Sequence, residues 1–160
     1  MPRILALCLL LSLVACVSKP PLPDESWRLI GKLSLRTKTE SRILGIDWRH
    51  VAGDNAIVLS GPLGVKVASV TTERGKLILD TGDAIILYDE NDQVSKGELA
   101  GLRLPWRQLA NWVRSGETVI TSEGNWQFQI TDVSAEGPVS MWLEHPEISM
   151  KLKVNRWEIR

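Results

Sequence analysis

The sequence predicts a mainly β protein, in which one curved antiparallel sheet is closed by one or two short helices. Three observations predict this fold. Apolar and polar residues alternate with a period of two in several segments, most clearly over 27–36. Short turns such as 61–64 join successive segments, and short turns require antiparallel pairing. One segment, 105–115, instead carries apolar residues at helical spacing.

The alternating segments define the expected strands. They are 27–36, 44–49, 56–60, 65–70, 76–79, 84–88, 126–131 and 148–159. In the last segment the apolar positions are even-numbered up to Val154 and then shift to Trp157 and Ile159. We therefore expect a β-bulge near Asn155 or Arg156.

The helical segment has its own start and stop signals. Pro105 stands where a helix can begin, Arg114 lies in the last turn, and Gly116 follows it. A second, shorter helix is expected over 95–101. A three-turn helix cannot cover a whole sheet, but it can close one side of a curved one. The side chains expected over the concavity are Leu102, Leu104, Trp106 and Trp112.

The N-terminus carries an export signal. Arg3 precedes an apolar run over 4–13 that is too short to span a bilayer, and Ala15-Cys16 resembles a bacterial lipobox. The predicted organisation is a lipoprotein signal peptide over 1–15, a lipidated Cys16 with a Pro-rich tether over 16–26, and a β domain over 27–160. The alternatives are an ordinary signal peptide with an incidental cysteine, or a buried apolar segment. Val17, which stands where Asp would retain a lipoprotein in the inner membrane, favours the outer membrane.

Composition excludes several functions. The formal net charge is +0, so there is no basic surplus for binding nucleic acid. Of the two cysteines, Cys8 leaves with the signal and Cys16 carries lipid, which leaves no thiol pair for a disulfide or a metal. Seven of the nine aromatic residues are Trp, a side chain suited to lining an apolar cavity or lying at a membrane interface.

Catalytic patterns are missing from the sequence. It contains no Gly-x-Ser-x-Gly, no phosphate-binding loop and no Gly-x-Gly-x-x-Gly. No motif places His50 or His145 beside a nucleophile, and two histidines are too few for a His-rich zinc site. We therefore expect no enzyme activity, no metal and no cofactor.

Three local motifs resemble the outer-membrane lipoprotein receptor family LolB. They are Gly61-Pro62-Leu63-Gly64-Val65, then Gly101-Leu102-Arg103-Leu104-Pro105 with Leu109, Trp112, Val113 and Gly116 after it, and Met150-Lys151-Leu152-Lys153-Val154-Asn155-Arg156-Trp157. Trp27 to Gly31, the Trp48 strand and Asn125-Trp126 follow the family's order, so the resemblance covers nearly all of 27–160.

The resemblance implies a half-barrel of antiparallel strands with helices over an apolar cavity. It implies a monomeric receptor, anchored in the outer membrane by its N-terminal acyl chains and facing the periplasm. Such a receptor accepts acylated lipoproteins from the periplasmic carrier LolA and inserts them in that membrane. The chain is short for this family before Trp27 and between Gly116 and Asn125, which predicts a more open cavity.

The resemblance also assigns roles to residues. The family's protruding leucine maps onto Leu63, so Pro62, Leu63 and Gly64 form the expected membrane-contact loop. The alternative is a hairpin turn whose leucine folds back onto the sheet. The candidates for lining the acyl cavity are Leu44, Ile46, Trp48, Trp112, Trp126, Phe128 and Leu152. Alternation alone does not say which sheet face is concave.

Other functions remain open at the level of sequence. The main alternative is a lipid-anchored structural or assembly lipoprotein that uses the same sheet to bind a protein partner. An esterase would need a histidine within hydrogen-bond reach of a nucleophile. A module that binds a small apolar ligand would differ from the receptor only in its cargo.

Overall fold

The computed structural model describes residues 26–89, 106–115, 119–120 and 125–159. In these residues ten strands form one antiparallel sheet in the order β6-β5-β4-β3-β2-β1-β10-β9-β8-β7. The strands are β1 (Trp27–Thr37), β2 (Ser41–Val51), β3 (Asp54–Ser60), β4 (Lys66–Glu73), β5 (Lys76–Asp80), β6 (Ile85–Asp89), β7 (Val119–Ile120), β8 (Gln127–Ser134), β9 (Gly137–His145) and β10 (Ile148–Ile159). The predicted signal peptide over 1–15 and all but the last residue of the predicted tether over 16–26 lie outside the described residues.

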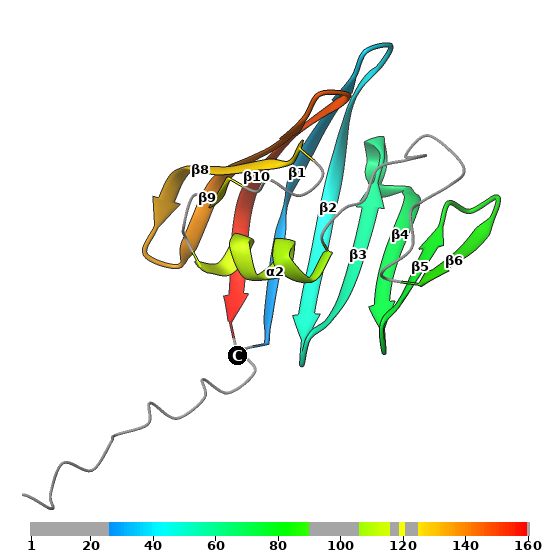
Figure 1. The fold of residues 1–160 in the computed structure, drawn as a ribbon, viewed down its shortest axis with the longest axis horizontal. Helices are drawn as coiled ribbons and strands as arrows, with labels where there is room; N and C mark the ends of the chain where they lie inside the picture. Colours follow the sequence, from blue (N-terminus) through cyan, green and yellow to red (C-terminus); the bar gives the residue numbers. More distant parts are fainter. Residues whose placement is uncertain (1–25, 90–105, 116–118, 121–124, 160) are drawn as a thin grey trace, which may run out of the picture.

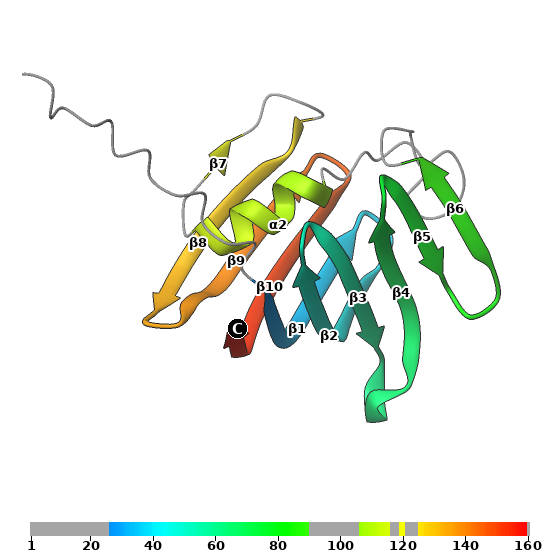
Figure 2. The ribbon, with the colours of Figure 1, turned by 90° about the horizontal axis from the view of Figure 1, so that it is seen from below.

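The sheet is open and strongly curved. Its two edges, β6 and β7, do not pair with each other, so it is not closed into a barrel. Figures 1 and 2 show it bending around the helix α2 (Trp106–Ser115), which lies on the concave side near β8, β9 and β10. The predicted fold class, a curved antiparallel sheet closed by a helix, is confirmed.

β1 and β10 are neighbouring interior strands of the sheet, and the predicted bulge lies between them. Ile30 pairs with Arg156 and Gly31 with Val154, so Asn155 is the extra residue. The bulge explains why the apolar phase shifts between Val154 and Trp157, because both of these side chains are buried. It also brings the backbones together: a Cβ on Gly31 would overlap the carbonyl oxygen of Lys153.

The predicted main helix is present. Leu109, Ala110 and Val113 are buried, as the helical spacing indicates, and Trp112 is partly buried. The shorter helix expected over 95–101 lies outside the described residues, as do Leu102 and Leu104. The side chain of Trp106 is also not described.

Two strands were not predicted: the two-residue β7, which pairs with β8, and the longer β9. β9 has Met141 and Leu143 buried on the concave face, but Trp142 between them points to the other face. Apolar side chains on both faces hide the alternation, and Pro138 near the start of the strand argues against a strand interior. The expected strands are otherwise present, with longer bounds in β2, β4 and β8.

Candidate functional site

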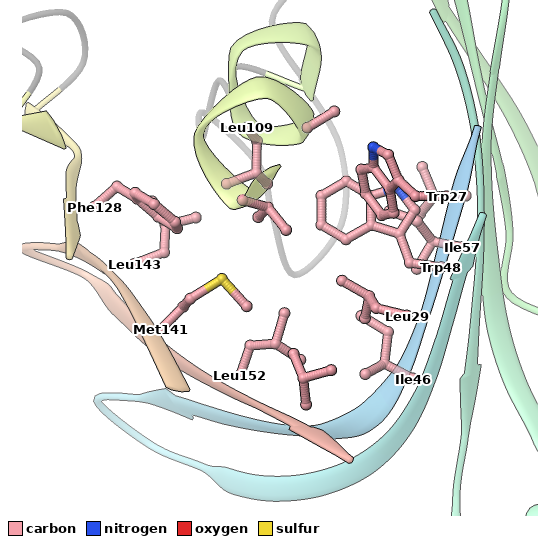
Figure 3. Close-up of a cluster of buried hydrophobic side chains, with 14 of the residues drawn as sticks. Trp27, Leu29, Ile46, Trp48, Ile57, Leu109, Phe128, Met141, Leu143 and Leu152 are labelled. Carbon is pink, nitrogen blue, oxygen red and sulfur yellow. The ribbon is translucent and has the colours of Figure 1, made fainter. Parts of the chain in front are cut away.

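The concave face of the sheet is apolar and converges beneath α2. Figure 3 shows side chains from two opposing arms of the sheet pointing toward one another below the helix, with Leu109 pointing down from above. Trp27, Leu29, Ile46, Trp48 and Ile57 come from one arm, Phe128, Met141 and Leu143 from the other, and Leu152 from the floor between them. All of these are buried.

A cluster of three tryptophans lines one end of this face. The ring of Trp27 lies 5.2 Å from that of Trp48 and 5.6 Å from that of Trp157, both edge to face. The indole nitrogen of Trp157 donates a hydrogen bond to the Pro138 carbonyl oxygen at 2.8 Å. The three rings together form a broad apolar part of the concave face, and the Trp157 indole nitrogen in it is hydrogen-bonded.

Buried polar groups hold Trp48 in place. Its indole nitrogen donates to Asn55 Oδ1 at 2.9 Å, and the Asn55 side-chain and backbone nitrogens both donate to Thr72 Oγ1. Asn55 and Thr72 are both buried. His50 Nδ1 lies 3.0 Å from the same Asn55 oxygen, and the His50 ring stacks on Trp27. This network fixes the orientation of the indole.

The opposite wall is also aromatic. Trp112 of α2 stacks on Phe128 of β8 with ring centroids 5.9 Å apart, so the helix is packed to the sheet through these rings. Trp126, which precedes β8, is buried and lies 4.9 Å from the His145 ring.

The seven cavity candidates lie on this concave side, to different degrees. Those buried in the core are Ile46, Trp48, Trp126, Phe128 and Leu152. Trp112 is partly buried against them, and Leu44 is partly buried opposite Leu33.

Leu63 projects from the molecule. It lies in a one-turn 3-10 helix, η2 (Pro62–Gly64), between β3 and β4, and its side chain is 101% exposed. Its φ of 64° is in the left-handed region, which costs a non-glycine residue about 1 kcal/mol. The turn is held by hydrogen bonds from Gly61 N to Val65 O and from Gly64 N to Gly61 O. Leu63 therefore does not fold back onto the sheet.

The two histidines contact structural partners. His145 Nδ1 accepts a hydrogen bond from the Glu147 backbone N–H, and His50 has the contacts given above. Among the described residues, no group of three or more His, Cys, Asp or Glu side chains is placed to hold a metal ion. Within the described ranges of the chain, no helix is long and apolar enough to cross a membrane.

Sequence reasoning missed part of the concave face. Trp27 and Trp157 were not chosen as lining residues, although both alternate with charged neighbours and so had a signal. Met141 and Leu143 were hidden in the unpredicted β9. Asn55 lies just before the expected strand over 56–60, and no sequence pattern gives it a role.

The chain is similar in sequence to one family of known proteins. Residues 25–130 match the family model described as "Outer membrane lipoprotein LolB". A protein of that name from Chromobacterium violaceum is 24% identical over 98% of this chain and 98% of its own length. One from Shewanella sp. strain MR-7 is 26% identical over 96% of this chain and 87% of its own length. One from Chromohalobacter salexigens is 30% identical over 69% of this chain and 59% of its own length.

Proposed function

The chain belongs to the LolB family of outer membrane lipoproteins, and from this premise we propose that it is a lipoprotein receptor of that membrane. In this proposal it accepts acylated lipoproteins from the periplasmic carrier LolA and inserts them in the bilayer. Acyl chains on Cys16 anchor the receptor itself, on the periplasmic side. The family is one of lipoprotein localisation, and no enzyme activity is part of the proposal.

The observation that carries the proposal is the apolar concave face beneath α2. Moving an acyl chain out of water is worth about 0.8 kcal/mol per CH₂, so free chains must pass between apolar surfaces. Side chains from both arms of the sheet and from the helix offer such a surface on one side of the molecule (Figure 3).

Chain entry requires α2 and the sheet to separate. The helix meets the sheet through Leu109, Val113 and the Trp112–Phe128 stack, all of them apolar contacts. An acyl chain inserted there replaces apolar contacts with apolar contacts, so the exchange needs no external energy source. A higher affinity for the chains than that of the carrier is sufficient to drive transfer.

The membrane-contact role belongs to Leu63. Burial of a leucine side chain is worth roughly 1.5–3 kcal/mol of free energy, which the exposed Leu63 does not gain. Its left-handed backbone adds a further cost. Insertion of this side chain into a bilayer provides the free energy of burial that the protein alone does not. Pro62 and Gly64 shape the turn, since Gly64 also has a positive φ, of 75°.

A handover assay tests the function. Residues 16–160 carrying Cys16→Ser are mixed with LolA loaded with a lipoprotein, and a pull-down measures which protein holds the cargo. We expect transfer without ATP or detergent. The matched control is the same cargo without its acyl chains, which should remain unbound.

Two other outcomes would contradict the proposal. If the folded protein takes no cargo, the receptor function is wrong, and binding of a protein partner by the sheet becomes the better explanation. If cargo without acyl chains transfers equally well, the concave face is not recognising lipid.

A further inference from the structure

The convex face of the sheet carries a group of cations for which the described part of the chain provides no ion pair. Lys32 and Lys153 stand directly opposite each other on β1 and β10, with Lys151 and Arg36 further along the same two strands. Lys32, Arg36 and Lys153 are exposed, and Lys151 is partly buried. Among the described residues no ion pair involves any of these four, which we call the basic face.

Opposed lysines weaken a sheet, because like charges directly across a strand pair repel. The other end of the same convex surface is built differently. There Arg28 bridges Asp47 at 2.6 Å and Glu158 at 3.3 Å, and Arg156 lies 3.2 Å from Glu158. On β1 and β10 the cations near Arg28 are therefore paired with carboxylates. The four cations of the basic face, at the other end of these strands, form no ion pair within the described residues.

Few carboxylates lie near the basic face. Two carboxylates follow from the register: Glu144 of β9 pairs with Ser149 of β10, and Asp132 of β8 pairs with Ser140, which itself pairs with Lys153. The corresponding positions on β2 are Ser41, Ile43 and Gly45. The local charge is therefore positive, although the formal net charge of the whole chain is +0.

Apolar side chains accompany the cations. Trp142 pairs with Lys151, whose ammonium lies 4.8 Å from the centre of the indole ring. Ile43 pairs with Ser34, which lies between Lys32 and Arg36 on β1, and Ile43 is 68% exposed. Basic residues interleaved with Trp and Ile are typical of surfaces that lie in the headgroup region of a membrane.

The basic face lies at the same end of the sheet as Leu63. Lys32 pairs with Gly45, Gly45 pairs with Ser60, and the chain turns into η2 immediately after Ser60. In Figure 1 the β1–β2 hairpin and the β3–β4 turn both lie at the upper end of the sheet.

We propose that the basic face binds the anionic headgroups of phospholipids and sets the orientation of the protein on the bilayer. Lys32, Lys151 and Lys153 contact headgroup phosphates while Trp142 and Ile43 lie among the headgroups beside the Leu63 turn. This places the convex side toward the membrane and leaves the concave side open to incoming cargo. The proposal extends the proposed function, since it rests on membrane contact at Leu63.

Vesicle binding tests the proposal. Residues 16–160 carrying Cys16→Ser are sedimented with phosphatidylethanolamine vesicles that either contain or lack phosphatidylglycerol. The test variant is Lys32→Gln/Lys151→Gln/Lys153→Gln. A lysine near an anionic surface contributes about fivefold in partitioning, so the triple change should weaken binding to the anionic vesicles on the order of 100-fold. Added salt should weaken the unchanged protein in the same way.

A charge-matched control separates location from net charge. Arg49→Gln/Arg74→Gln/Lys76→Gln removes three exposed cations at the opposite end of the strands. This control should bind anionic vesicles within about threefold of the unchanged protein, and thermal unfolding checks that both variants fold. Equal losses in the two variants would show that net charge alone attracts the protein, which would overturn the proposal.

The remaining outcomes distinguish this inference from the proposed function. Leu63→Glu should weaken binding to both kinds of vesicle, because the leucine inserts among acyl chains whatever the headgroup. If only that variant loses binding, the basic face has no lipid role and the receptor function is untouched. If the lysine variant binds vesicles normally but fails to take cargo from LolA, the face binds an acidic protein surface and the lipid proposal is wrong.

Discussion

Leu63 combines two unfavourable features in one residue. Its side chain is fully exposed and its backbone is left-handed, and each of these costs free energy in water. Unfavourable local geometry that persists in a well-packed surrounding is characteristic of functional positions.

Leu63→Glu should leave folding and cargo acceptance intact and should impair delivery to bilayers. A charged side chain in the bilayer is costly, by several kcal/mol, while an exposed one in water is not. Transfer of cargo from the receptor to vesicles measures the effect. The matched control is Val133→Glu, which charges another exposed apolar position. Normal delivery by the Leu63 variant would remove the membrane-contact role.

Trp157 is the residue on which the tryptophan cluster depends for packing. It is 8% exposed, contacts Trp27 and donates to the Pro138 carbonyl oxygen. Trp157→Ala should lower the free energy of unfolding by about 3–5 kcal/mol in urea. Trp157→Phe keeps most of the apolar surface and loses the hydrogen bond, so its cost should be smaller. A loss well under 1 kcal/mol for the alanine variant would contradict the burial of this side chain.

At the scale of elements, the bulge between β1 and β10 sets the register and the spacing of these two neighbouring strands. Gly31 sits at this bulge, where the Lys153 carbonyl occupies the space that a Cβ would need. The bulge also keeps Val154 and Trp157 on the concave face on either side of the extra residue.

Gly31→Ala should therefore destabilise the protein by about 1–3 kcal/mol, because two backbones must move apart. Gly45→Ala is the matched control on the neighbouring strand. Its added Cβ would lie 3.6 Å from the Ser60 carbonyl oxygen, an ordinary contact, so its effect should be small. Urea unfolding of both variants measures the difference. Equal losses in the free energy of unfolding for the two variants would mean that the loss of glycine's backbone flexibility causes the destabilisation, and not the close approach of the two strands.

At the scale of the whole molecule, an ion-paired cluster joins three strands on the convex side. Arg28 of β1 donates to both oxygens of Asp47 on β2, at 2.8 and 2.6 Å, and reaches Glu158 on β10. The hydrogen bonds from Arg28 lower the pKa of Asp47 below its ordinary value of 3.8, and Asp47 in turn raises the pKa of the guanidinium.

The pKa shift predicts how stability depends on pH. Because folding lowers the pKa of Asp47, its carboxylate stabilises the native state above the ordinary value of 3.8. That contribution is lost as the pH falls through the lower pKa of the folded state. Asp47→Asn should therefore cost about 1 kcal/mol near neutral pH and nothing in strong acid.

Urea unfolding at the two pH values measures this dependence. Asp54→Asn, at an exposed position that begins β3, removes the same charge as a control. If the loss of stability in Asp47→Asn does not change with pH, the substitution acts through packing and hydrogen-bond geometry and not through the charge of the carboxylate.

The sequence by itself determined the class of fold and most of its elements. Alternation between apolar and polar residues is a local pattern, so it identified the strands around Trp27, Trp48 and Phe128. The spacing of Leu109, Ala110 and Val113 identified α2 in the same way. The shift from Val154 to Trp157 even located the bulge, because a register change leaves its mark in one strand alone.

The tertiary structure decided everything that depends on which strands are neighbours. Period-two alternation is the same for both faces, so only the curvature of the paired sheet made Ile46 and Leu152 concave. The opposition of Lys32 and Lys153 across β1 and β10 joins positions far apart in the chain, and no local pattern contains it. Non-local pairing brought these residues together, and it alone gave the two faces of the sheet their different chemistry.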